Sequence, residues 1–162
     1  MHVEKSYKNR RSVSYNFHPP LSAFPVALIC VTALLEIAML FTQREWLTKA
    51  AGVCLCVGAV FAGAAFLSGY SASSDASLTF PVPPDVIVRH HVVGRFLLFA
   101  LVPCVALHFI TQKAIHAKLG FRIAYLASLG LCVALVLYTG YLGGTLVFRY
   151  GAGVGASLPA KR

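Results

Sequence analysis

Four apolar runs, each long enough to cross a bilayer, constrain the fold of this chain more than any other feature. A membrane-spanning helix needs about 20 mostly apolar residues. Hydrophobic residues make up 58% of the 162 residues and charged residues only 12%, which leaves too little polar surface for a water-soluble domain. The sequence therefore predicts an all-α fold, a four-helix transmembrane bundle with both termini on the same side. The predicted segments are a polar N-terminal segment 1–20, a four-span membrane domain 21–148 with spans at about 21–42, 50–69, 91–111 and 122–148, and a C-terminal tail 149–162.

The basic residues outside the spans indicate an orientation. We call the side of the termini side A and the opposite side B. Side A carries eight basic residues, namely Lys5, Lys8, Arg10, Arg11, Arg89, Arg149, Lys161 and Arg162. Side B carries five, namely Arg44, Lys49, Lys113, Lys118 and Arg122. Because cytoplasmic segments of membrane proteins carry the excess of Lys and Arg, we predict that the termini lie in the cytoplasm. The connection over about 70–90 is long and contains three prolines, which predicts a structured loop on the membrane surface.

Charge and cysteine content exclude two classes of function. The net charge of +9 comes mostly from tails and loops, as membrane topology requires, and does not indicate nucleic-acid binding. All five cysteines fall inside apolar runs, where a free cysteine behaves as a small buried hydrophobe. Neither a disulfide framework nor a zinc site is predicted.

Three histidines occur at the side-A ends of two spans that run in the same direction. His18 precedes the first span, and His90 and His91 open the third. Two imidazoles from different helices at one membrane level are what a b-type haem needs in a helix bundle. We predict one haem b per chain with His18 and His90 as metal ligands. His91 remains an alternative, about 100° away from His90 around the helix.

A second group of polar residues is expected near side B. His108 is 18 positions after His90, which corresponds to five helical turns and about 27 Å, so the two histidines share a helix face but not a haem. Glu36 is the only acid inside a span and lies at the level of His108. The pair is a candidate second site, in a proton path or a quinone pocket. The alternative is a protonated carboxyl bonded to a neighbouring helix. For a second haem, His108 would need His116 or a non-histidine ligand as partner.

Further side-A residues are candidates for cofactor binding. Arg95 is placed to pair with a haem propionate or to extend to the membrane interface. Gly140, Gly143 and Gly144 share one helix face, and Gly94 follows His90 by one turn. Such small residues allow close approach of another helix or of a flat macrocycle.

Several motifs resemble those of a bacterial family of four-helix membrane proteins that is catalogued as a domain of unknown function. The similar stretches are HPPLSAFPVALI from His18, LSGY at 67–70, the histidine at 90, and GYLGGTLVFRYGAGV at 140–154, in the same order as in the family. The resemblance implies a four-helix membrane domain, which in this family sometimes occurs beside redox modules such as Rieske domains. By the same resemblance, His18 and His90 match the family's histidines. Tyr150 departs from the pattern, because family members often have histidine at this position.

These observations favour a membrane electron-transfer subunit in the bacterial inner membrane. The predicted activity resembles that of a b-type cytochrome, relaying electrons between a quinone and a partner redox protein. The predicted partners are membrane lipids and other subunits of a membrane redox complex. The alternative function is a cofactor-free structural subunit of a larger membrane complex, which would be colourless.

Overall fold

The fold is a bundle of four long helices, as the sequence predicts. The computed structural model describes residues 17–113 and 119–152; the N-terminal residues 1–16, the stretch 114–118 with His116, and the tail 153–162 lie outside the described residues. The helices are α2 (His18–Thr42), α3 (Glu45–Thr79), α4 (Pro84–Lys113) and α5 (Leu119–Tyr150). Each is long and apolar enough to span a membrane. The all-α, four-span prediction is confirmed.

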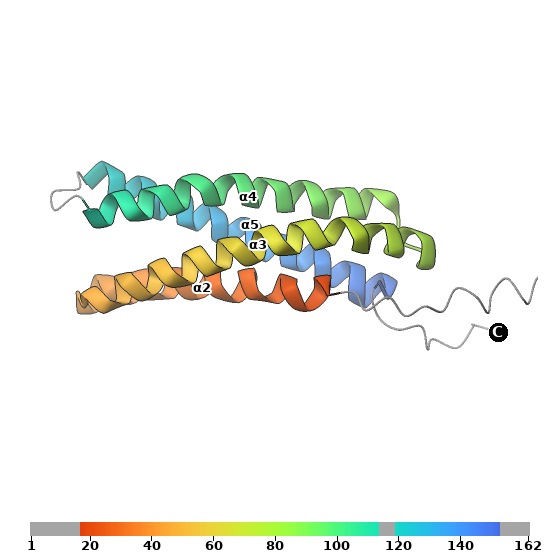
Figure 1. Cartoon of the computed structure of the whole chain (residues 1–162), viewed down its shortest axis with the longest axis horizontal. Coiled ribbons are helices and arrows are strands. Elements are labelled where there is room, and N and C mark those ends of the chain that lie inside the picture. Colours follow the sequence, from red (N-terminus) through yellow and green to blue (C-terminus); the bar gives the residue numbers. More distant parts are fainter. Residues whose placement is uncertain (1–16, 114–118, 153–162) are drawn as a thin grey trace, which may run out of the picture.

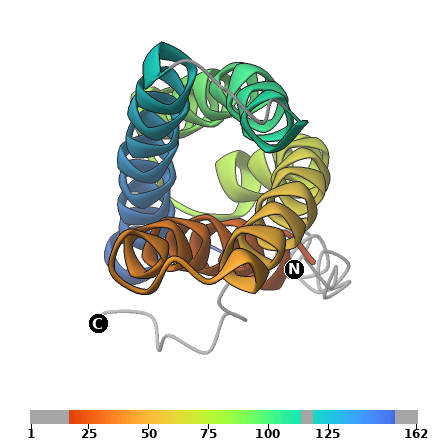
Figure 2. The same cartoon turned by 90° about the vertical axis from the view of Figure 1, so that its left-hand side faces the viewer.

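The helices follow one another around the bundle in chain order. Each helix packs on the two that neighbour it in this ring, most extensively within the pairs α2–α3 and α4–α5. Figure 2 shows the ring, with α2 diagonally opposite α4 and α3 diagonally opposite α5. In Figure 1, α2 begins and α5 ends at the right-hand end of the bundle, so both lie on side A. Residues on diagonal helices therefore face each other across the interior.

The outer surface is apolar and the interior contains polar side chains, as expected for a protein in lipid. Large hydrophobic residues such as Leu34, Val60 and Val102 are exposed on the outside, and in a membrane they contact lipid. The interior is filled by small and aliphatic residues. Its most buried members are Ile29, Leu55, Leu101, Cys104, Cys132 and Val136. The buried polar residues are Thr32, Glu36, Thr48 and His108.

The connection between α3 and α4 is much shorter than predicted. The expected loop over about 70–90 is mostly helical, and only residues 80–83 lie between the two helices. The serines are accommodated in α3 because their hydroxyls bond to carbonyls of the preceding turn; Ser73 Oγ, for example, donates to the Tyr70 carbonyl at 2.8 Å. Pro84 begins α4, where its missing N–H costs no helical hydrogen bond. The polar residues that predicted a loop therefore belong to α3, which extends beyond its apolar segment.

The start of α4 changes the position of two predicted site residues. His90 and His91 do not open the helix, because α4 begins six residues before His90. In contrast, α2 begins at His18, with Pro19 and Pro20 in its first turn. Because α2 is the shortest of the four helices, its first residue reaches the same level as a residue well inside α4.

The turn between α2 and α3 contains one residue in a left-handed conformation. Gln43 has φ 52° and ends α2, with its N–H donating to the Met39 carbonyl at 3.0 Å. A non-glycine residue in this conformation costs about 1 kcal/mol. We expect Gln43→Gly to stabilise the protein by up to about 1 kcal/mol. The thermal unfolding midpoint in detergent should rise for Gln43→Gly and stay unchanged for Gln43→Ala; equal midpoints for both variants would contradict this explanation.

Candidate functional site

The structure brings His18 and His90 together across the bundle on side A. His18 comes from α2 and His90 from α4, which are diagonally opposite. The ring centroids are 6.0 Å apart, and the ring planes are nearly perpendicular at 87°. Two imidazoles on opposite faces of one metal ion, each at about 2 Å, have ring centres about 6 Å apart. The pair therefore has the separation that a shared metal ion requires.

Hydrogen bonds orient the His18 ring. Its Nδ1 lies 2.8 Å from the Ala65 carbonyl and 3.1 Å from Ser68 Oγ, both on α3. A carbonyl can only accept, so Nδ1 carries the proton and donates it to Ala65. This leaves Nε2 as the nitrogen with a lone pair, in the arrangement that holds metal-ligating histidines in place.

His90 carries a buried polar atom without a hydrogen bond. Its Nδ1 is the one buried side-chain nitrogen or oxygen without a partner among the residues that the structure describes. Leaving a buried polar group unsatisfied costs about 1–3 kcal/mol. The ring also interacts with the backbone of Thr139 on α5, so a histidine that only packs between helices and a histidine that takes a ligand both fit this position.

Glycines on the two remaining helices border the histidine pair. A Cβ added to Gly69 on α3 would lie 3.1 Å from His18 Cε1, and one added to Gly143 on α5 would lie 3.3 Å from His90 Cε1. Of the other predicted glycines, Gly94 faces Phe66 and Gly140 faces Val26, each at ordinary packing distance. Gly144 meets only Phe148 of its own helix. The predicted glycine face is thus divided among different neighbours, and only Gly143 contacts a histidine.

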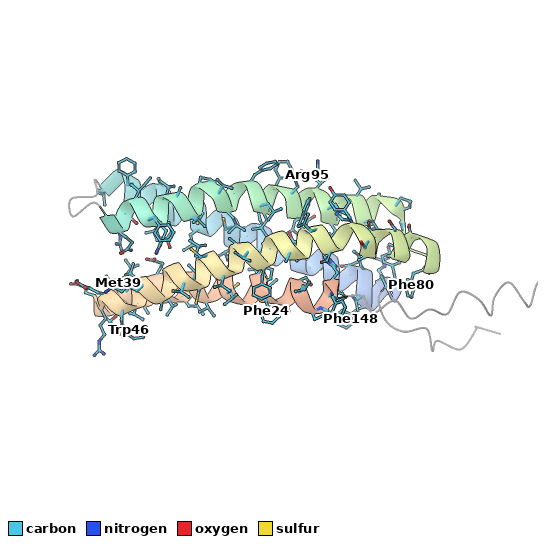
Figure 3. All side chains as sticks on the ribbon, in the orientation of Figure 1. Phe24, Met39, Trp46, Phe80, Arg95 and Phe148 are labelled. Atoms are coloured by element: carbon cyan, nitrogen blue, oxygen red, sulfur yellow. The ribbon has the colours of Figure 1, made fainter. Side chains whose placement is uncertain are left out.

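Arg95 and His91 lie outside the pair. Arg95 is exposed on α4 (Figure 3), five residues and therefore about 140° around the helix from His90. The structure does not bring Arg95 to the interior; pairing with a propionate and extension toward the interface both stay predictions for an exposed arginine at this depth. His91 packs against Phe66 and Tyr70 at ring distances of 6.4 Å and 5.3 Å.

Near side B, the Tyr125 side chain connects Glu36 and His108, and the sequence alone did not predict this residue. Tyr125 of α5 donates its hydroxyl proton to Glu36 Oε1 at 2.9 Å. The same hydroxyl oxygen lies 3.2 Å from His108 Nδ1. His108 Nδ1 and Glu36 Oε1 are 3.7 Å apart. The three side chains come from α2, α4 and α5, and their residues are 2–3% exposed.

The fourth helix contributes a glycine to this cluster. A Cβ added to Gly52 of α3 would lie 2.5 Å from His108 Nε2, too close for any side chain without displacement of the ring. No sequence motif marks Tyr125, Gly52 or Ala65, whereas Gly69 belongs to the LSGY stretch at 67–70. The available signal was spacing: Tyr125 lies six residues after the start of α5, and Glu36 lies six before the end of α2. Both therefore lie at one depth.

Cysteines and metal clusters do not add to these sites. All five cysteines lie in the described part of the chain and are free thiols. Within residues 17–113 and 119–152, no group of three or more His, Cys, Asp or Glu side chains has the arrangement of a metal site. A haem iron differs from such a centre because the protein supplies only its axial ligands.

The fold and its buried polar residues define an integral membrane protein with four spanning helices. The model of a family described as predicted membrane protein (DUF2231) matches residues 14–156. The chain therefore belongs to this family, and the family resemblance drawn from its sequence motifs is confirmed. That description names membrane location and no activity. No curated protein and no solved structure matches the chain.

Proposed function

We propose that this protein is a membrane electron-transfer subunit that resembles a b-type cytochrome and holds one haem b between His18 and His90. The observation that carries the proposal is the 6.0 Å separation of two imidazoles from diagonal helices. Electrons would pass between a quinone in the bilayer and a partner redox protein. No part of the proposal requires a second haem at His108.

The residues around the pair fit a flat cofactor. His18 and His90 would be the axial ligands, one from each diagonal helix. The other diagonal, α3 and α5, presents Gly69 and Gly143 against the imidazole rings, and a backbone without Cβ atoms permits such close approach of flat groups. The unpartnered Nδ1 of His90 supports a bound group at this place.

The protein would supply orientation and a dry environment. The Ala65 carbonyl holds His18 in one tautomer, which leaves Nε2 with the lone pair that a metal ligand needs. The haem itself would supply reversible one-electron chemistry, with a potential tuned by its axial ligands and by burial. The apolar residues of the bundle would exclude water from the bound cofactor.

Location and partners are further parts of the proposal. The eight basic residues on side A against five on side B favour cytoplasmic termini in a bacterial inner membrane. The histidine pair lies at the cytoplasmic end in that orientation. A partner redox subunit would then exchange electrons with this end of the bundle.

The alternative is a cofactor-free structural subunit. One observation favours it: His18 already has hydrogen bonds to α3, and both rings contact glycines without any cofactor. In this case the hydrogen bonds and packing contacts of the histidines stabilise the association of the helices, and the purified protein is colourless.

The electron-transfer role is tested by reduction with a quinol. The purified protein in lipid vesicles is mixed anaerobically with a short-chain quinol, and absorption is followed in the visible range. We expect the sharp α band of a reduced b-type haem to appear. A haem that dithionite reduces but quinol does not would contradict the quinone link, and a flat spectrum in both cases favours the structural subunit.

A further inference from the structure

The side-B cluster of Glu36, Tyr125 and His108 has no part in haem binding, yet all four helices surround it. A carboxyl group inside a membrane costs several kcal/mol unless neighbours compensate it. Here Glu36 is 3% exposed and its described polar neighbours are the Tyr125 hydroxyl and the His108 ring. Such a carboxyl has a function by default in a membrane protein. The arrangement of its hydrogen bonds indicates which one.

The hydrogen bonds in the cluster run in one direction. The Tyr125 hydroxyl has a single proton, and it donates that proton to Glu36. The tyrosine oxygen must then accept from His108, so Nδ1 of His108 carries a proton. The result is a continuous chain from His108 through Tyr125 to Glu36, with heavy-atom distances of 3.2 Å and 2.9 Å. Both distances are within the range of proton transfer between side chains.

We propose that the Glu36–Tyr125–His108 cluster is a proton-binding site in which Tyr125 relays a proton from His108 to Glu36. A proton binds at Nε2 of neutral His108 while Glu36 is a carboxylate. The Nδ1 proton of His108 moves to the Tyr125 oxygen, and the original hydroxyl proton of Tyr125 moves to Glu36 Oε1. The products are neutral His108 with its proton on Nε2, an unchanged Tyr125 and a protonated Glu36. One proton has been taken up and every bond is accounted for.

The surroundings keep the relay intact and place it near one surface. From α3 the facing residue is Gly52, whose missing side chain lets the His108 ring fit. The other titratable groups within electrostatic range are Cys104 on α4, beside Cys132 of α5, and Arg122 on α5. Tyr125 lies six residues from the start of α5, about 9 Å from the side-B end of that helix. A proton from side B thus travels a short distance to reach the cluster.

This proposal goes beyond electron transfer and does not depend on haem. A colourless protein with a working relay, or a haem protein without one, would separate the two proposals. The relay also differs from a purely structural role for the three residues. A structural hydrogen-bond network stabilises the fold, whereas a relay sets the rate at which the Glu36 proton exchanges.

The test is infrared spectroscopy of the purified protein in lipid, recorded over a pH titration and during transfer from H₂O to D₂O. The chain has only five Asp and Glu residues, so the carboxyl band of protonated Glu36 can be assigned as the band missing in Glu36→Gln. We expect deuterium exchange of this band to slow by about tenfold or more in Tyr125→Phe. The matched control is Tyr141→Phe, which removes a hydroxyl from an exposed tyrosine on the same helix and should leave the rate unchanged.

Two outcomes would overturn the proposal. One is the absence of any carboxyl band from Glu36 at every pH tested, and the other is exchange in Tyr125→Phe as fast as in the unmodified protein. If Tyr125→Phe fails to fold, His108→Gln carries the same test, because a glutamine amide does not take up a proton. Exchange must slow in that variant as well, and an unchanged rate would overturn the relay.

Discussion

Alanine in place of His18 or His90 should remove the haem absorption of the protein and leave its membrane insertion intact. Each histidine would supply one of the two axial bonds, and a small side chain at either position leaves the iron without that ligand. The haem-to-protein ratio of each variant, purified in detergent, should fall at least about tenfold, because loss of even a hydrogen-bond partner of a metal ligand costs affinity on that scale. Full haem content in both variants would rule out these two ligands.

The matched control is alanine at His91, the neighbour of His90 on α4. His91 packs against Phe66 and Tyr70 and, like His18, borders Gly69. If His90 and not His91 is the second ligand, His91→Ala should keep most of the haem. Misfolding is distinguished from ligand loss by adding free imidazole to His18→Ala. Partial return of the α band would show that the site is intact apart from the missing ring.

Alanine at Gly52 should destabilise the bundle, although alanine normally favours a helix. The new Cβ would lie 2.5 Å from His108 Nε2, and the ring cannot move away without losing its bond to Tyr125. Overpacking of this kind costs about 1–3 kcal/mol. Thermal unfolding in detergent should therefore show a lower midpoint for Gly52→Ala.

The same substitution at Gly63 provides the comparison. Gly63 is on the same helix, and a Cβ added there has no atom within 4 Å. Helix propensity alone should then stabilise Gly63→Ala by up to about 1 kcal/mol. If Gly52→Ala and Gly63→Ala change the midpoint equally, the contact between Gly52 and His108 does not constrain the packing.

The number of helices and the membrane level of each histidine were predictable from this sequence, because both follow from segment length and rise per residue. In lipid, four long apolar runs with few charges must form helices to satisfy their backbone hydrogen bonds, and the structure has four. The common level of His18 and His90 followed from the direction of their spans. The end of α3 was not predictable from composition, because its last turns are polar and rich in serine; the serines at 73, 74 and 77 satisfy their hydroxyls on carbonyls of their own helix.

The neighbours that each side chain contacts could not be predicted from the sequence and required the structure. The glycines at 140 and 144 were placed at the correct depth, but their neighbours are Val26 and Phe148 and not the histidines. Tyr125 was missed because a tyrosine in an apolar run has no motif, and its role depends on Glu36 of a helix 89 positions earlier in the chain. The depth of a residue in the membrane follows from its position along one helix. The direction in which its side chain points depends on how all four helices pack.

The central claim is that this chain holds one haem between His18 and His90, and one measurement tests it most directly. The protein is purified from a membrane containing its native partners, and dithionite-reduced minus oxidised absorption spectra are recorded with haem quantified per chain. We expect a sharp b-type α band at close to one haem per chain. A flat spectrum with no haem would contradict the account and identify the protein as a cofactor-free subunit.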